Sequence, residues 1–293
     1  MGSPCEIKVY LNDNAQPPSF FEKLRVELER LEQKYSKFRI DSFLSRINAN
    51  AAKGAPTELD DETLSIINHA STCFHQSDGL FDITAGALNK LWDFRKNEVP
   101  STQKISDALL VTGFNKLSID NALLKMPVGM ELDLGGVVKE YAADALAVKA
   151  NQLGIKSGII NLGGDIAVIG CQPDGKSWPV GISNPENFSS AIAKIHISSG
   201  GLASSGDYQR FFIFRGKRYS HIINPKTGYP SSGLRAVSVA ANLCTVAGSI
   251  ATIAMLKGEE SALDWLNDMG LPYVVMDSTG KLKQGKDSDL MMR

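Results

Sequence analysis

The sequence lacks long hydrophobic runs and any concentration of charge of one sign. No stretch approaches the about 18 consecutive apolar residues of a membrane-spanning helix. The first residues have neither the charged region nor the apolar core of a signal peptide. We therefore expect a cytoplasmic protein for the chain as given, and the alternative is that a leader has been removed. The net charge is −1, from 31 basic and 32 acidic residues with no arginine-rich arm, which argues against a nucleic-acid partner.

Cysteines and histidines are too scattered to indicate a metal or redox site. The four cysteines occur singly, without a C-x-x-C pair, which excludes a zinc ribbon or redox dithiol and argues against a disulfide scaffold. The four histidines form no H-E-x-x-H motif. The Rossmann fingerprint G-x-G-x-x-G and the P-loop G-x-x-x-x-G-K-[ST] are absent as well, which weakens nicotinamide and Walker-type interpretations.

Hydrophobic periodicity predicts an α+β fold. Strands outnumber the helices available as crossovers, so mixed or antiparallel sheets covered by helices are favoured over a doubly wound sheet. No linker or internal repeat divides the 293 residues, and we expect a single domain over residues 1–293. The expected strands are 5–11, 116–119, 130–134, 158–162, 166–169, 178–183, 191–198, 211–214, 236–240 and 273–276; the expected helices are 19–35 (opened by a capping box at Ser19 and Glu22), 61–74, 104–110, 137–153, 246–256 and 262–269.

Two glycine turns are the most informative feature that the sequence does contain. They are Asp133-Leu-Gly-Gly136, just before a predicted helix, and Asn161-Leu-Gly-Gly-Asp165, just after a predicted strand. Backbone N–H groups at such turns can approach a ligand without obstruction by a Cβ atom, and a helix N-terminus favours phosphate. The turns therefore indicate a phosphorylated, nucleotide-like ligand. The alternative is that the four glycines serve only tight turns.

These turns belong to a longer series of motifs that spans nearly the whole chain. In order, the motifs are Met1-Gly-Ser3, Ser36-Lys-Phe-Arg-Ile-Asp-Ser42 with Arg46-Ile-Asn48, Gly79-Leu-Phe-Asp-Ile-Thr84 with Leu91-Trp92, Asp133-Leu-Gly-Gly-Val-Val-Lys-Glu-Tyr-Ala-Ala-Asp144, Asn161-Leu-Gly-Gly-Asp165, Ser205-Gly-Asp-Tyr-Gln-Arg210 and His221-Ile-Ile-Asn-Pro-Lys-Thr-Gly-Tyr-Pro230. Together they closely resemble the ApbE family of flavin transferases. Seven motifs in the same order are far more specific than any one of them.

The resemblance implies a fold, a reaction and a set of site residues. Members of the family have an α+β fold with the flavin in a cleft between two lobes. They move the FMN half of FAD onto a threonine or serine of a partner flavoprotein, with release of AMP and the help of Mg²⁺. By resemblance His221 would act at the reacting phosphate, and the residues lining FAD would be Met1, Phe38, Leu80, Phe81, Asp82, Asp133, Lys139 and Ile223. A histidine suits this chemistry because the attacking hydroxyl needs a base that titrates near neutrality.

Several of these residues also have a purely structural interpretation. His221 would then be a loop histidine bonded to its own turn, and Lys139 a solvated helix lysine. Asp133 would cap the following turn or helix. Phe81 and Trp92 would belong to the hydrophobic core.

One departure from the family pattern concerns the metal site. The family usually has an aspartate four residues before a threonine, and both contribute to Mg²⁺ binding; here the run Val246-Ala-Gly-Ser-Ile-Ala-Thr252 has Gly248 at that place. The resemblance then leaves Thr252 and the backbone carbonyl of Gly136 as metal ligands. Glu140, where the family commonly has glycine, is either a substitute carboxylate or a solvated helix acid. We expect Gly248 in the first turn of its helix, where an aspartate should not harm folding.

The departure keeps two other functions open. The first alternative is a paralogue that binds FAD or FMN without transferring it. The second is an FAD pyrophosphatase, which splits FAD into FMN and AMP with water in place of the protein hydroxyl.

Overall fold

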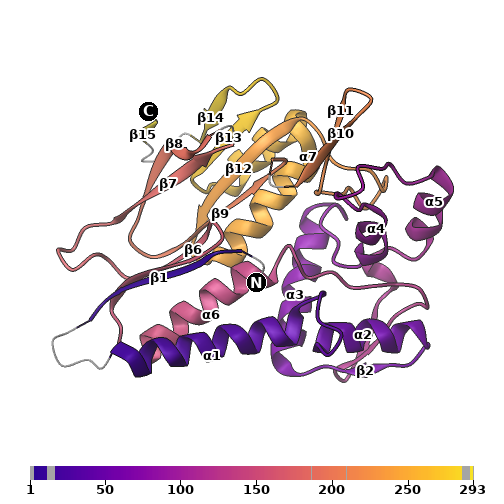
Figure 1. Cartoon of the computed structure of the whole chain (residues 1–293), viewed down its shortest axis with the longest axis horizontal. Coiled ribbons are helices and arrows are strands. Elements are labelled where there is room, and N and C mark those ends of the chain that lie inside the picture. The colour runs from indigo at the N-terminus through magenta and orange to yellow at the C-terminus, as the bar shows by residue number, and fades with distance from the viewer. Residues whose placement is uncertain (1–2, 12–16, 186, 209, 286–290, 293) are drawn as a thin grey trace.

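An antiparallel sheet forms the centre of the fold in the computed structural model, which describes residues 3–11, 17–185, 187–208, 210–285 and 291–292 (Figure 1). Within these residues the sheet has seven strands in the order β1-β5-β6-β9-β12-β13-β14. The order follows the chain because successive strands are joined as antiparallel neighbours. The strand bounds are β1 Cys5–Tyr10, β5 Ser157–Leu162, β6 Asp165–Ile169, β9 Gly200–Gly206, β12 Leu234–Ala241, β13 Tyr273–Asp277 and β14 Leu282–Gln284.

Each face of this sheet is covered by a different layer. Alternate residues of β6 point to opposite faces: Ala167 and Ile169 belong to the main core, whereas Ile166 and Val168 belong to a second cluster. Helices α6 (Val138–Gln152) and α7 (Cys244–Met269) contribute to the main core and cover one face. The second cluster joins the other face to a smaller sheet, in the order β15-β8-β7, made of β7 Trp178–Asn184, β8 Asn187–Ile197 and β15 Met291–Met292.

The remaining helices form a group beside α6 (Figure 1). They are α1 Pro17–Tyr35, α2 Phe43–Ala52, α3 Asp61–Gln76, α4 Gly86–Leu91 and α5 Thr102–Leu110, with a short 3₁₀ turn at Phe114–Lys116. Short strands accompany them: β2 Thr57–Glu58, β3 Ser118–Asp120 and β4 Leu123–Lys125 form one small sheet, and β10 Phe211–Phe214 pairs with β11 Lys217–Ser220. A third cluster around Leu88, Trp92 and Phe212 packs α4 and α5 against β10 and β11. The α+β prediction is therefore confirmed, with antiparallel pairing in all the named strands.

Two predicted element boundaries are wrong for identifiable reasons. Helix α1 already begins at Pro17, so Ser19 lies inside the helix and is not its N-cap; proline is well tolerated in a first turn. The predicted strand at residues 130–134 makes a single bridge, between Glu131 and Ala85. The pairing does not continue past this bridge, because the segment that contains Ala85 turns into α4 at Gly86.

Helix α7 joins two segments that the sequence analysis predicts as separate helices. Helical structure extends from Cys244 to Met269, but Gly258, with φ 74° and ψ 178°, is not helical and kinks it. The kink falls between the two helices expected at 246–256 and 262–269. Among the described residues, no helix combines the length and the apolarity that crossing a bilayer would demand.

Candidate functional site

The two glycine turns are brought together by an ion pair. Lys139 lies in the first turn of α6, directly after the first glycine turn, and Asp165 is the last residue of the second turn and the first of β6. The Lys139 Nζ and Asp165 Oδ2 atoms are 2.5 Å apart, and the Asp165 side chain is 2% exposed. The pKa of Asp165 is raised, because burial disfavours its carboxylate more than the positive charge of Lys139 stabilises it. Lys139 is therefore not a solvated helix lysine, as one interpretation of the sequence had it.

The glycines serve different purposes in the two turns. Gly163 and Gly164 have φ of 68° and 100°, a left-handed backbone that L side chains rarely adopt, and the Asn161 side-chain oxygen accepts the Gly164 N–H at 2.8 Å. Gly135 and Gly136, in contrast, do not have a positive φ. The tight-turn explanation therefore accounts for the second pair and leaves the first pair to be explained by the missing Cβ atoms.

Asp133 organises the first turn and carries a lysine from a distant segment. Its carboxylate accepts the Gly135 N–H at 2.9 Å, the Asn89 side-chain amide at 2.8 Å and the Lys37 ammonium at 2.7 Å. Burial raises the pKa of Asp133, but the charge of Lys37 and these hydrogen bonds outweigh it, and the pKa lies below its usual value. Asp133 caps the turn, as the structural interpretation proposed, and it also places a cation beside it.

The segment 80–82 lies next to the first glycine turn. The Phe81 ring is 4% exposed, and a Cβ atom on Gly136 would lie 3.8 Å from it. Asp82 accepts the Thr84 N–H and hydroxyl at 2.8 and 2.6 Å and the Phe114 N–H at 3.1 Å. Leu80 packs against the main core as a partly buried side chain. Phe81 therefore contacts the turn itself, whereas Asp82 and Leu80 hold their own segment in place.

Phe38 and Ile223, both predicted to line the flavin, differ sharply in exposure. Phe38 is 79% exposed in the loop that follows Lys37, the lysine bound to Asp133. Ile223 is 8% exposed and belongs to the cluster around Trp92 and Phe212. Phe38 is thus available to a ligand, whereas Ile223 contributes mainly to packing. Met1 lies outside the described residues.

His221 is a half-buried histidine with an unused ring nitrogen. Its backbone N–H donates to the Arg210 carbonyl at 3.0 Å, but its Nδ1 atom has no hydrogen-bond partner among the described residues. Burial, together with the charges of Arg210, Lys139 and Lys37, lowers the pKa of His221 to about 4, although a hydrogen bond with the Arg210 backbone acts in the opposite direction. The side chain is therefore neutral at physiological pH and is electrostatically coupled to both lysines of the glycine turns.

Thr252 and Gly136, the two predicted metal ligands, differ in how their oxygen atoms are engaged. The Thr252 hydroxyl lies 2.8 Å from the Ser205 hydroxyl of β9. Leu134 accepts the N–H groups of Val137 and Val138, whereas no backbone N–H within the described residues donates to the Gly136 carbonyl. The Gly136 carbonyl thus retains its acceptor capacity.

Glu140 occupies the space in front of Gly248. A Cβ atom on Gly248 would lie 2.6 Å from Glu140 Cγ and 2.9 Å from Glu140 Oε1. Glu140 is 7% exposed, and its Oε2 atom has no hydrogen-bond partner among the described residues. Burial, followed by the charge of Asp165, raises the pKa of Glu140 well above its usual value. The solvated-acid interpretation of Glu140 is wrong, and so is the placement of Gly248 in the first helical turn, because α7 begins at Cys244 and Gly248 is buried.

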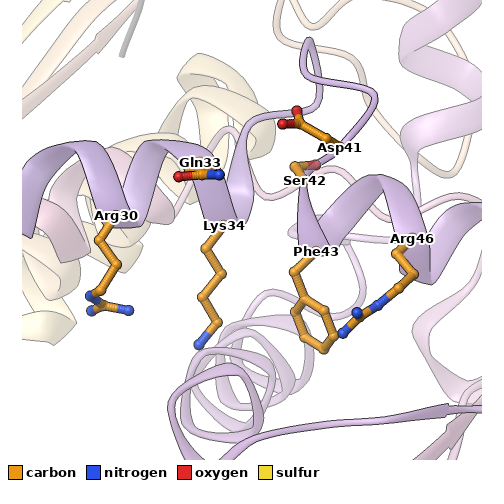
Figure 2. Close-up of a pocket in the computed structure, with 7 residues that line it drawn as sticks. All are labelled: Arg30, Gln33, Lys34, Asp41, Ser42, Phe43 and Arg46. Atoms are coloured by element: carbon orange, nitrogen blue, oxygen red, sulfur yellow. The ribbon is translucent and has the colours of Figure 1, made fainter.

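A surface hollow at the junction of α1 and α2 is separate from this site (Figure 2). Its cations are already satisfied: Arg30 and Lys34 each lie 2.7 Å from Glu62, and the Arg46 guanidinium stacks 4.6 Å from the centre of the Phe43 ring. None of the predicted flavin or metal residues lines the hollow, whose walls are Arg30, Gln33, Lys34, Asp41, Ser42, Phe43 and Arg46.

Three residues of the site were missed as site residues by the sequence analysis. Asp165 was visible only as part of a turn motif, and Lys37 only as part of a loop motif. Asn89, which donates to Asp133, carries no signal in the sequence, because it lies in α4, 44 residues away along the chain. Long-range pairs of this kind depend on the tertiary fold.

Comparisons with known proteins agree with this fold. Solved structures share the architecture: the ApbE protein of Thermotoga maritima superposes with a TM-score of 0.88 at 28% identity, over 96% of this chain and 93% of that one. The flavinyl transferase ApbE of Pseudomonas stutzeri gives 0.86 at 29% identity, over 98% and 92%.

The chain belongs to the ApbE family, whose model matches residues 1–275. A protein of Haemophilus influenzae named FAD:protein FMN transferase is 29% identical over 279 residues, which cover 90% of this chain and 80% of that protein. Its Escherichia coli namesake is 30% identical over 270 residues, covering 88% and 77%.

Proposed function

We propose that this protein is a FAD:protein FMN transferase, which attaches the FMN half of FAD to a threonine or serine of a partner flavoprotein. The convergence of both glycine turns at the Lys139–Asp165 pair carries the proposal. The pair brings the N-terminus of α6 and Lys139 to the second glycine turn, and Asp133 holds Lys37 at the first turn, an arrangement that suits a pyrophosphate. The relatives named above are transferases, which supports transfer over simple binding or hydrolysis of FAD.

The residues have distinct roles in this proposal. Lys139 and Lys37 neutralise the pyrophosphate, while Asp133 and the Leu80–Asp82 segment hold the first turn in shape. Phe38 is free to stack on an aromatic ring of the ligand because it is exposed beside Lys37. Ile223 keeps the loop after His221 in place through the cluster that it shares with Trp92.

The transfer step itself needs a base for the acceptor hydroxyl. The hydroxyl oxygen attacks the phosphorus atom of the FMN half, the bond from that phosphorus to the bridging oxygen breaks, and AMP leaves with that oxygen. The hydroxyl proton passes to the His221 imidazole, which is neutral and has an unused nitrogen. The anionic pyrophosphate offsets the cations that weaken this base, because an adjacent negative charge favours the protonated imidazole.

The available oxygen atoms fit Mg²⁺. The Gly136 carbonyl and the Thr252 hydroxyl are hard oxygen ligands of the kind that Mg²⁺ takes together with substrate phosphates. When bound, the ion would spread the negative charge that develops on the pyrophosphate.

One incubation tests the proposed function. The purified protein is mixed with FAD, Mg²⁺ and an acceptor domain that carries an Asp-x-x-Thr-Gly-Ala-Thr-like segment, and flavin fluorescence of the acceptor is read in a denaturing gel. We expect a fluorescent acceptor and one AMP for each FMN attached. Binding of FAD is measured separately by its stabilisation of the protein against heat. AMP release without a labelled acceptor would indicate the pyrophosphatase, and FAD binding without either product would indicate the binding paralogue.

A further inference from the structure

We propose that Glu140 is the anionic ligand of a divalent-cation site and that Gly248 provides the room for its carboxyl group. This inference rests on the proposed function, whose cation it supplies with a charge. Glu140 belongs to the first turn of α6, and its carboxyl fills the space in which a side chain at position 248 of α7 would lie. An aspartate at 248 and the present position of Glu140 are mutually exclusive, since even a Cβ atom there would approach Glu140 Cγ to 2.6 Å.

Among the described residues, Glu140 has a buried carboxyl oxygen with neither a hydrogen bond nor an ion pair, whereas the two neighbouring carboxyl groups are engaged. Asp165 is engaged by Lys139 at 2.5 Å. Asp144 is fully engaged at the start of α7, where it accepts the Cys244 N–H at 2.8 Å and the Thr245 N–H and hydroxyl at 2.9 and 2.6 Å. Glu140 is 7% exposed, and its Oε2 atom has no hydrogen-bond partner within the part of the chain that the structure describes; Asp165 Oδ2 also accepts no hydrogen bond there, but it has Lys139 as its ion-pair partner.

A buried carboxyl oxygen without a partner is unfavourable unless something binds to it. The alternative, a well-packed structural acid, would require donors around both oxygens, as Asp144 has. A cation that arrives with the ligand supplies the missing partner.

The neighbouring oxygen atoms indicate the class of cation. Thr252 lies one helical turn after Gly248 on the same face of α7. Gly136 lies in the first glycine turn, two residues before α6 begins at Val138. Carboxylate, hydroxyl and carbonyl oxygens together favour a hard divalent ion such as Mg²⁺ or Mn²⁺. Within the described residues no three His, Cys, Asp or Glu side chains gather as a metal cluster. The ion would therefore complete its coordination with phosphate oxygens and water, as Mg²⁺ commonly does.

Direct measurement of Mn²⁺ binding tests the role of Glu140 without relying on transfer activity. Bound Mn²⁺ is quantified from the loss of the free-ion signal in electron paramagnetic resonance, with and without FAD. We expect Glu140→Gln to weaken Mn²⁺ binding by about tenfold or more, since even residues that only support a metal ligand have effects of that size. Glu260→Gln, the same chemical change at an exposed position of α7, is the matched control and should bind Mn²⁺ like the wild type.

A second pair of variants tests whether the carboxyl can come from either helix. Glu140→Gly removes it, and the double variant Glu140→Gly with Gly248→Asp returns it from α7. We expect the single variant to lose Mn²⁺ affinity and the double variant to regain most of it, with FAD affinity in the absence of metal unchanged in both.

The outcomes separate this inference from the proposed function. If Glu140→Gln and Glu140→Gly bind Mn²⁺ as tightly as the wild type, or the wild type binds none with FAD present, Glu140 is not a cation ligand, whatever the transfer assay shows. If FAD fails to bind or to label an acceptor, the proposed function fails. A normal Mn²⁺ dependence on Glu140 in the same protein would still establish the cation site.

Discussion

Lys139 on α6 and Asp165 at the start of β6 form an ion pair with a 2.5 Å separation between Nζ and Oδ2, and this pair joins two turns that are 26 positions apart along the chain. The Asp165 side chain is 2% exposed, so its charge depends on Lys139 for compensation. The same lysine is the cation that the proposed function assigns to the pyrophosphate. Its structural and its functional contributions can be separated by substitution.

Replacing Lys139 alone should destabilise the fold. Lys139→Met leaves Asp165 buried without a partner, and we expect a loss of about 3 kcal/mol in the free energy of unfolding at pH 7. Adding Asp165→Asn removes the uncompensated charge and should recover most of that loss, while FAD affinity stays low in both variants. Urea unfolding and FAD titration measure the two effects. Normal FAD affinity in the stable double variant would exclude Lys139 from ligand binding.

The transfer reaction should depend on His221 more than FAD binding does. We expect His221→Ala to bind FAD nearly as the wild type does and to transfer FMN about 10²- to 10⁴-fold more slowly, the usual effect of losing a positioned base. Single-turnover labelling of the acceptor gives the rate. His196→Ala, at an exposed position of β8, is the control. Wild-type rates in His221→Ala would make His221 a structural loop residue.

His221 should also make stability dependent on pH. Its pKa is about 4 in the folded protein, below the 6.5 of an unperturbed histidine, because burial disfavours the charged ring. The unfolded chain therefore takes up a proton before the folded chain does, and stability is lost as the pH falls from about 6.5 toward 4. From pH 7 to pH 5 this contribution amounts to about 2 kcal/mol. His221→Gln should lose that much less stability over the same interval, as measured by urea unfolding at each pH; parallel losses in both proteins would contradict the depressed pKa.

The sequence predicts the scaffold of this site better than its charges. The strands expected at 158–162, 166–169 and 236–240 and the helices expected at 61–74 and 137–153 rest on local patterns, and the fold confirms them as β5, β6, β12, α3 and α6. The extended segment at 130–134 could not be separated from a strand by pattern alone, because only the turn of its partner into α4 limits the pairing to one bridge.

The departures at Glu140 and Gly248 illustrate what local patterns cannot show. Each residue is ordinary in its own helix, and the sequence left Glu140 as either a substitute ligand or a solvated acid. Their meaning comes from the contact between α6 and α7, which buries the carboxyl over the glycine. The burial of Glu140 excludes the solvated acid. Whether donors surround its carboxyl group also depends on the tertiary fold, and among the described residues its Oε2 atom has none.

The exposed ring of Phe38 offers a test of flavin contact that leaves the fold intact. The ring is 79% exposed and lies one residue after Lys37, which is bound to Asp133 of the first glycine turn. Because the ring buries little surface, we expect Phe38→Ala to leave the free energy of unfolding unchanged. If the ring stacks on the isoalloxazine or adenine of FAD, its loss should weaken binding by about 1–3 kcal/mol, the usual range for an aromatic side chain stacked on a base.

Ile40→Ala is the matched control, since Ile40 is 97% exposed in the same loop and has no ring to stack. Fluorescence titration with FAD measures both affinities. Equal affinities in Phe38→Ala, Ile40→Ala and the wild type would remove Phe38 from the flavin site and leave its exposure to be explained by contact with the acceptor protein.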